Sequence, residues 1–131
     1  ERLGTSNTTS LAARVRAANA WPADYFISIH ANANTDPVVN GTEVYVYRKY
    51  TQSYYLAQHI LSAIVDVVGT RDNGVRVNPS LYVLRRTNMP AVLVELAYVT
   101  NAGDAEKLET MQPEFARGIY EGLLSYFGLD Q

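Results

Sequence analysis

Cysteine is absent from this sequence of 131 residues, so neither a disulfide bond nor a thiolate metal site can form within it. Any metal ion would have to be bound by histidine and carboxylate ligands. An excess of one charge is also lacking, because 11 basic residues stand against 13 acidic ones and the net charge is −2. No basic run is present, which disfavours nucleic acid as a partner.

Long apolar runs are missing as well. None approaches the roughly 20 residues that a membrane-spanning helix needs, so we expect no membrane span. Hydrophobic residues nevertheless make up 47% of the chain, which is normal for a globular protein. The length and composition together predict one domain with a sizeable core.

Segments with helical periodicity alternate with segments typical of strands. Helices are expected at 11–20, 53–68 and 114–127, with a short polar helix or turn at 101–110. Strands are expected at 25–32, 41–48, 81–84 and 91–99, and loops or connections at 1–9, 35–40 and 71–78. This order predicts a single α/β domain over residues 1–131, with a mixed, largely parallel sheet flanked by helices on both faces.

The expected strand at 25–32 is apolar at first and then changes to His-Ala-Asn. In open α/β sheets, ligands bind beyond the carboxyl ends of the strands, so His30 is a candidate for metal or proton chemistry. The alternative is a histidine that caps the strand and bonds a neighbouring carbonyl. His59 lies beside the apolar stripe of the helix at 53–68, and we interpret it as a helix-flank residue rather than a ligand.

The apolar run at 91–99 contains one carboxylate, Glu95. Burying a carboxylate is costly unless a metal ion, a cation or a bound proton compensates the charge, which favours a functional role. If Glu95 and His30 share a pocket, they could act as general base and zinc ligand, although a structural ion pair would also fit. Glu43 belongs to an alternating strand expected near a sheet edge, where an exposed carboxylate is the default interpretation.

Several motifs follow one another along nearly the whole chain. They are Leu11-x-x-Arg14 with Ala18-Asn19, Ser28-Ile29-His30-Ala31-Asn32-Ala33, Gly41-Thr42-Glu43-Val44-Tyr45, Arg71-Asp72-Asn73-Gly74-Val75-Arg76, Leu81-Tyr82-Val83-Leu84, and Pro90-Ala91-Val92-Leu93-Val94-Glu95 with Asn101. With these motifs the chain resembles the catalytic domain of zinc-dependent N-acetylmuramoyl-L-alanine amidases of the amidase-3 type. It departs from them at Leu96-Ala97-Tyr98, where a glycine–aromatic pair is more usual.

The resemblance implies a zinc cofactor, with His30 as one of its ligands. It also implies that Glu95 is the catalytic glutamate, which takes a proton from the attacking water and later delivers it to the departing amine. The bond cut would join N-acetylmuramic acid to L-alanine of the peptidoglycan stem peptide. Such an enzyme would act outside the cell, in the cell wall or periplasm, and an attached cell-wall-binding module is compatible with it.

Family members carry two further zinc ligands, a histidine and a glutamate, on a strand–helix segment that has no counterpart here. We therefore expect the N-terminal strand–helix segment of the domain to be missing from this sequence. A non-catalytic relative or fragment that binds cell-wall peptide is the alternative function. A zinc carboxypeptidase is a weaker one, because it needs a residue to grip a terminal carboxylate. The spacing favours none of the candidates Arg71, Arg76, Arg85 and Arg86.

Overall fold

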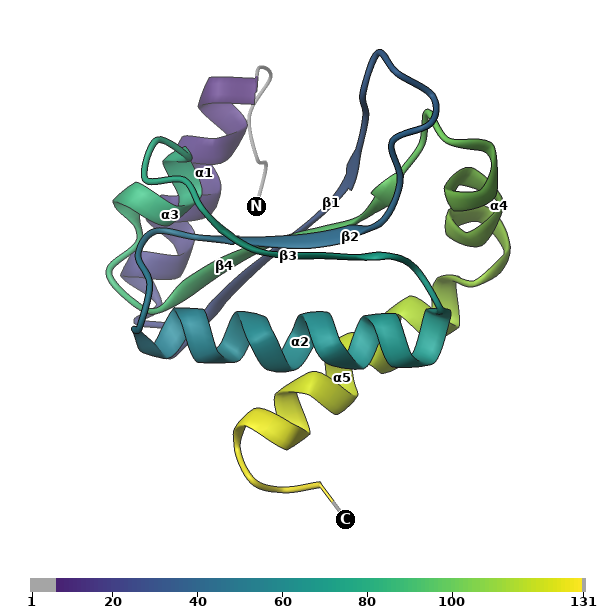
Figure 1. The fold of residues 1–131 in the computed structure, drawn as a ribbon. Coiled ribbons are helices and arrows are strands. Elements are labelled where there is room, and N and C mark those ends of the chain that lie inside the picture. The colour runs from purple at the N-terminus through teal and green to yellow at the C-terminus, as the bar shows by residue number, and fades with distance from the viewer. Residues whose placement is uncertain (1–6, 131) are drawn as a thin grey trace.

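The computed structural model describes residues 7–130 and folds them into a single α/β domain (Figure 1). The elements in chain order are α1 (Asn7–Ala20), β1 (Phe26–Asn32), β2 (Thr42–Val46), α2 (Gln52–Val68), β3 (Asp72–Val77), α3 (Tyr82–Arg86), β4 (Ala91–Tyr98), α4 (Ala102–Thr110) and α5 (Gln112–Tyr126). The loop expected at 1–9 lies outside the described residues up to position 6, and residues 7–9 already belong to α1.

The four described strands form one mixed sheet in the order β1-β4-β2-β3. β1 and β4 are parallel, β2 and β3 are parallel, and β2 runs antiparallel to β4. The predicted mixed sheet is therefore confirmed. The expectation that β2 lies near a sheet edge was wrong, because β2 has a hydrogen-bonded neighbour on each side.

Helices cover both faces of the sheet, as predicted. On one face, Val44, Val46, Val92 and Val94 of the strands pack against Leu56, Ile60 and Ile64 of α2. On the other face, α1 and α3 contribute Val15, Val83 and Leu84, which pack against Ala91 and Leu93 of β4. α5 packs against α2 and adds Phe115 to the same core, and Figure 1 shows its C-terminal part below α2. Each fully buried aliphatic side chain in these layers contributes about 1.5–3 kcal/mol relative to exposure.

Two local predictions were wrong. The polar stretch at 71–78 forms β3 instead of a connection, because backbone pairing with β2 satisfies its peptide groups while it stands at one edge of the described sheet. The apolar run at 81–84 begins the short helix α3 rather than a strand. A helical turn lets the consecutive residues Val83 and Leu84 both be buried, which an alternating strand with one covered face would not.

Two glycines of α5 set its distance from α2. A methyl group added at Gly118 would lie 2.9 Å from the Cα atom of Ile64, and one at Gly122 only 2.6 Å from the Cα atom of Ile60. The second methyl group would also meet the carbonyl oxygen of His59 at 2.9 Å. Because these neighbours are backbone atoms, neither helix can relieve the clash by changing a rotamer.

We therefore expect Gly122→Ala to destabilise the domain. Overpacking costs about 1–3 kcal/mol, of which the better helix propensity of alanine returns about 1 kcal/mol, so the expected net loss is up to about 2 kcal/mol. Urea unfolding measures it. Gly103→Ala in α4 is the control, because its added methyl group would make only an ordinary 3.5 Å contact. Equal stability of the two variants would contradict the packing argument.

Candidate active site

Three ionisable residues form a row across the sheet. His30 of β1 stands opposite Glu95 of β4, and Glu95 stands opposite Glu43 of β2. Successive side chains of a strand alternate between faces, so Glu95 shares the face of Leu93, which packs under α1 and α3. The predicted neighbours His30 and Glu95 are therefore brought together, and the structure adds a second carboxylate beside them.

His30 is held as a neutral imidazole. Burial lowers its pKa from the ordinary value, and the positive charge of Arg14 on α1 lowers it further. The Ser28 hydroxyl lies 2.6 Å from Nε2 and orients the ring. The other ring nitrogen makes no hydrogen bond within residues 7–130, which leaves it available to a ligand. A neutral, oriented imidazole is the form that binds metal ions.

Glu95 is half-buried and lacks a full set of partners. Its Oε1 atom is buried without a hydrogen-bond partner among the described residues. Burial, and then the charge of Glu43, raise the pKa of Glu95 from its ordinary value of 4.5 to about 7. A carboxyl group with a pKa near neutrality and an unused buried oxygen is suited to exchanging a proton with a ligand.

Glu43 corrects a prediction, because this expected surface carboxylate is fully buried. Its Oε2 atom accepts hydrogen bonds from Tyr45 Oη at 2.6 Å and Arg76 Nη1 at 2.9 Å. Its Oε1 atom accepts them from Tyr98 Oη at 2.8 Å and Asn73 Nδ2 at 3.2 Å. Burial alone would raise the pKa of Glu43, but the hydrogen bonds and the Arg76 charge outweigh it, and the pKa is lowered. Glu43 is thus a fixed negative charge.

Two irregularities in strand pairing place the donors around Glu43. Between the pairs His30–Glu95 and Asn32–Tyr98, β4 has one residue more than β1, which brings Tyr98 to the face of Glu95. β3 likewise has one extra residue opposite β2, around Gly74, whose φ is +86°. Strict alternation in the sequence cannot reveal such an insertion, so sequence reasoning missed these donors.

The described residues include side chains of the types that bind zinc, but too few of them to complete a site. The neutral imidazole of His30 and the unpaired oxygen of Glu95 are both groups that zinc accepts. Within residues 7–130, however, no group of three or more histidine, aspartate or glutamate side chains could hold a metal ion. Catalytic zinc sites use three protein ligands, so His30 can supply only part of one.

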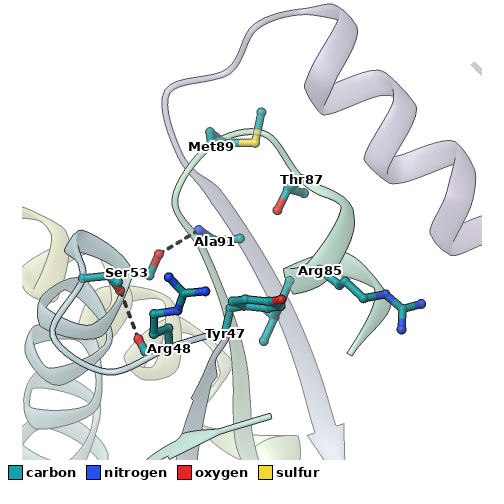
Figure 2. Close-up of a pocket in the computed structure, with 9 residues that line it drawn as sticks. Tyr47, Arg48, Ser53, Arg85, Thr87, Met89 and Ala91 are labelled. Atoms are coloured by element: carbon teal, nitrogen blue, oxygen red, sulfur yellow. Dashed lines mark hydrogen bonds between the residues drawn. The ribbon is translucent and has the colours of Figure 1, made fainter. Parts of the chain in front are cut away.

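A pocket of about 380 Å³ lies at the opposite end of the sheet, where β4 begins. Tyr47, Arg48, Ser53, Thr87 and Met89 are among its lining residues, and Figure 2 shows the Arg85 side chain extending away from them. The Ser53 hydroxyl accepts a hydrogen bond from the Ala91 amide at 3.1 Å. Among residues 7–130, its lining includes no carboxylate or histidine, the groups that most often carry acid–base catalysis.

The fold and the half-buried glutamate opposite a histidine are those of an α/β enzyme domain. More specifically, the chain belongs to the N-acetylmuramoyl-L-alanine amidase family of the Amidase_3 type, whose family model matches residues 2–125. Both the fold and the enzyme family expected from the motifs are thereby confirmed.

Individual relatives agree with this assignment. The N-acetylmuramoyl-L-alanine amidase LytC of Bacillus subtilis is 42% identical over 131 aligned positions, which cover 95% of this chain and 26% of LytC. The crystal structure of an N-acetylmuramoyl-L-alanine amidase from Clostridium difficile 630 superposes with a TM-score of 0.84 and 38% identity, covering 93% of this chain and 67% of that one.

The catalytic domain of CwlV, an amidase of Bacillus (Paenibacillus) polymyxa, superposes with a TM-score of 0.81 and 35% identity, covering 92% of this chain and 66% of that one. The chain thus spans about two thirds of these two solved structures. It spans between 25% and 50% of the first three curated relatives.

The raised pKa of Glu95 predicts a pH-dependent stability. The folded state binds this proton more tightly than the unfolded chain, so the free energy of unfolding should fall as pH rises from about 4.5 to about 7. Glu95→Gln should remove this contribution. Urea unfolding at several pH values, with a chelator present, should show a wild-type curve that declines relative to the variant across this window. Parallel curves would contradict the assigned pKa.

Proposed function

We propose that this chain is the catalytic part of a zinc-dependent amidase that acts on peptidoglycan. The bond hydrolysed is the amide between the lactyl group of N-acetylmuramic acid and L-alanine of the stem peptide. The observation that carries the proposal is Glu95, a half-buried carboxyl group opposite His30, with a pKa of about 7 and an Oε1 atom that has no hydrogen-bond partner among residues 7–130. Membership of the amidase family supports the choice of reaction.

Glu95 acts as the general base and then as the general acid. Its pKa lies near physiological pH, where a carboxyl group can both accept and return a proton efficiently. It accepts a proton from the water that attacks the amide carbonyl, and it delivers that proton to the departing amine of L-alanine. The unpaired Oε1 atom is the oxygen available for this exchange.

His30 contributes one zinc ligand, and the remaining ligands come from outside the described residues. In the tautomer that we propose, Nε2 donates a hydrogen bond to the Ser28 hydroxyl 2.6 Å away, which leaves the other ring nitrogen for the metal. Zinc, when bound, supplies a Lewis acid that polarises the amide carbonyl and lowers the pKa of water.

Glu43 supplies a fixed negative charge to the site and does not contact the substrate. Because it stays ionised beside Glu95, it keeps the pKa of Glu95 high enough for proton return at neutral pH. Arg76 and the hydroxyl groups of Tyr45 and Tyr98 keep the Glu43 carboxylate ionised. Their hydrogen bonds also hold it apart from the metal ligands. The motif around Glu43 is therefore part of the active site.

The place of action follows from the proposed substrate, which lies outside the cytoplasmic membrane. We therefore place the enzyme outside the cell, in the cell wall or the periplasm, and an attached wall-binding module would suit this role. Among residues 7–130, the helices are too short or too polar to cross a bilayer.

A second candidate is a relative that binds wall peptide without cleaving it. The shortage of metal ligands within the described residues is the observation that favours it. A carboxypeptidase is not favoured. Arg85 and Arg86 belong to α3, where Arg85 lines the pocket of Figure 2, and Arg76 is already paired with Glu43.

Glu95→Gln should abolish hydrolysis of purified peptidoglycan while zinc binding is retained. Removing a general base lowers kcat by about 100- to 10,000-fold, and the amide side chain keeps the size of the carboxyl group. Glu109→Gln, at an exposed position on α4, is the control and should cleave normally. Normal cleavage by the Glu95→Gln variant would show that the general base is assigned wrongly.

His30→Ala should weaken zinc binding by on the order of 100-fold or more, since even partners behind a ligand contribute 10- to 100-fold. Competition with a chromogenic chelator measures the affinity. His59→Ala is the matched control, because His59 bonds the Ser125 hydroxyl between α2 and α5 and lies away from the row. An unchanged affinity in the His30 variant would remove His30 from the metal site.

A further inference from the structure

A pocket of about 350 Å³ adjoins the row of carboxylates on its β3 side. Tyr98 and Asn73, which both donate hydrogen bonds to Glu43, also line this pocket. The remaining lining residues come from β3 with the residue before it and from the loop between β1 and β2; they are Asn34, Val38, Val39, Asn40, Arg71 and Arg76. Glu43 therefore lies between this pocket and Glu95.

The lining of this pocket is positively charged. Within the part of the chain that the structure describes, it contains two arginines and no acidic residue. Arg76 forms an ion pair with Glu43, although 47% of the Arg76 side chain remains exposed. The Arg71 guanidinium makes no hydrogen bond or ion pair with any residue in the range 7–130, while its own carbonyl oxygen anchors the Thr42 amide at 2.8 Å. The backbone of Arg71 is thus held in place, and its guanidinium has no partner among residues 7–130 and can bind a ligand.

The walls of the pocket are pre-formed rather than loose. The buried Asp104 accepts hydrogen bonds from the amides of Gly41 at 2.8 Å and Tyr98 at 2.9 Å, which ties the end of the loop to β4. Asn101 bonds the carbonyl oxygen of Pro37 at 2.9 Å. Gly41 has a φ of +114° and an added methyl group would lie 2.7 Å from the Arg71 carbonyl oxygen, so only glycine fits there.

The separation between the pocket and Glu95 follows from the strand order. β3 stands two strands from β4, and neighbouring strands lie about 4.8 Å apart, so the backbone that carries Arg71 runs about 10 Å from the backbone that carries Glu95. An extended peptide advances about 3.3–3.6 Å per residue, so this distance corresponds to roughly two to three residues. A carboxypeptidase would need its cation much closer, next to the scissile bond.

We propose that this pocket, with Arg71 as its anchor, binds a free carboxylate of the stem peptide two to three residues from the cleaved amide. The proposal rests on the proposed function. The glycan offers no free carboxylate, because the lactyl carboxyl group of muramic acid forms the amide bond. The free carboxylates of the substrate therefore lie on the peptide. Arg71 is then a specificity-determining residue that favours substrates with a free carboxylate over those with a carboxamide.

Three synthetic N-acetylmuramoyl tripeptides test this assignment, all with an amidated terminus. In the first, the second peptide residue carries a free carboxylate outside the main chain. In the second, the third residue does, and in the last both residues carry carboxamides instead. Binding to the Glu95→Gln protein is measured by titration calorimetry, with and without Arg71→Ala. Arg85→Ala at the opposite end of the sheet is the matched control.

Arg71→Ala should weaken binding of one of the free-carboxylate ligands by about 10- to 100-fold, the range expected for a charge-assisted hydrogen bond, and leave the carboxamide ligand unaffected. Arg71→Lys should restore part of the loss, and Arg85→Ala should change nothing. An equal loss for all ligands, or no loss for any, would overturn the proposal.

Hydrolysis by a zinc-loaded protein that carries all of its zinc ligands distinguishes the role of Arg71 from the proposed amidase function. With Glu95 intact, Arg71→Ala should raise KM for the free-carboxylate substrate while kcat stays unchanged. If neither the wild type nor the variant cleaves any ligand, the proposed amidase function fails. If both cleave every ligand with the same KM, the amidase function stands and the role of Arg71 is wrong.

Discussion

Two carboxylates directly opposite one another in neighbouring strands are the constraint on which this site depends. Like charges in such a pair are destabilising, and burial makes the repulsion stronger. The domain resolves the conflict by making the two groups unequal. Glu43 receives four hydrogen-bond donors and stays ionised, whereas Glu95 has a raised pKa and one oxygen without a partner in the described part of the chain. One pair of glutamates therefore supplies both a fixed charge and a titrating acid.

Much of the surrounding architecture serves this inequality. The extra residue in β4 turns Tyr98 toward Glu43, and the extra residue in β3 does the same for Asn73. α1 lies over the same face and brings Arg14 near His30, where its charge helps to keep the imidazole neutral. α2 and α5 pack on the opposite face and stabilise the sheet without reaching the row.

Strong periodic signals made the fold largely predictable from the sequence. The apolar runs at β1 and β4 and the stripe of α2 identified these elements within one or two residues at each end. The same runs singled out His30 and Glu95, because each polar group interrupts or ends an apolar segment. β3 and α3 were predicted wrongly, since their type is decided by pairing with β2 and by packing against α1 and β4 rather than by local pattern.

Glu43 shows why the rest of the site escaped sequence reasoning. Its burial depends on donors from β2, β3 and β4 that are up to 55 residues away in the chain. Only the register of the strands and the two irregularities bring them together. The wrong expectation of an exposed carboxylate near an edge followed from the alternating pattern of β2, which looks the same whether the polar face meets water or tyrosine hydroxyl groups.

The most direct test of the account is to identify the new chain ends that the zinc-loaded protein produces from purified peptidoglycan. Labelling of free amino groups followed by mass spectrometry should find L-alanine as the new amino terminus and a free lactyl carboxyl group on muramic acid. A different new amino terminus, a released C-terminal residue, or no product at full zinc occupancy would contradict the assignment of this chain as the catalytic part of an amidase.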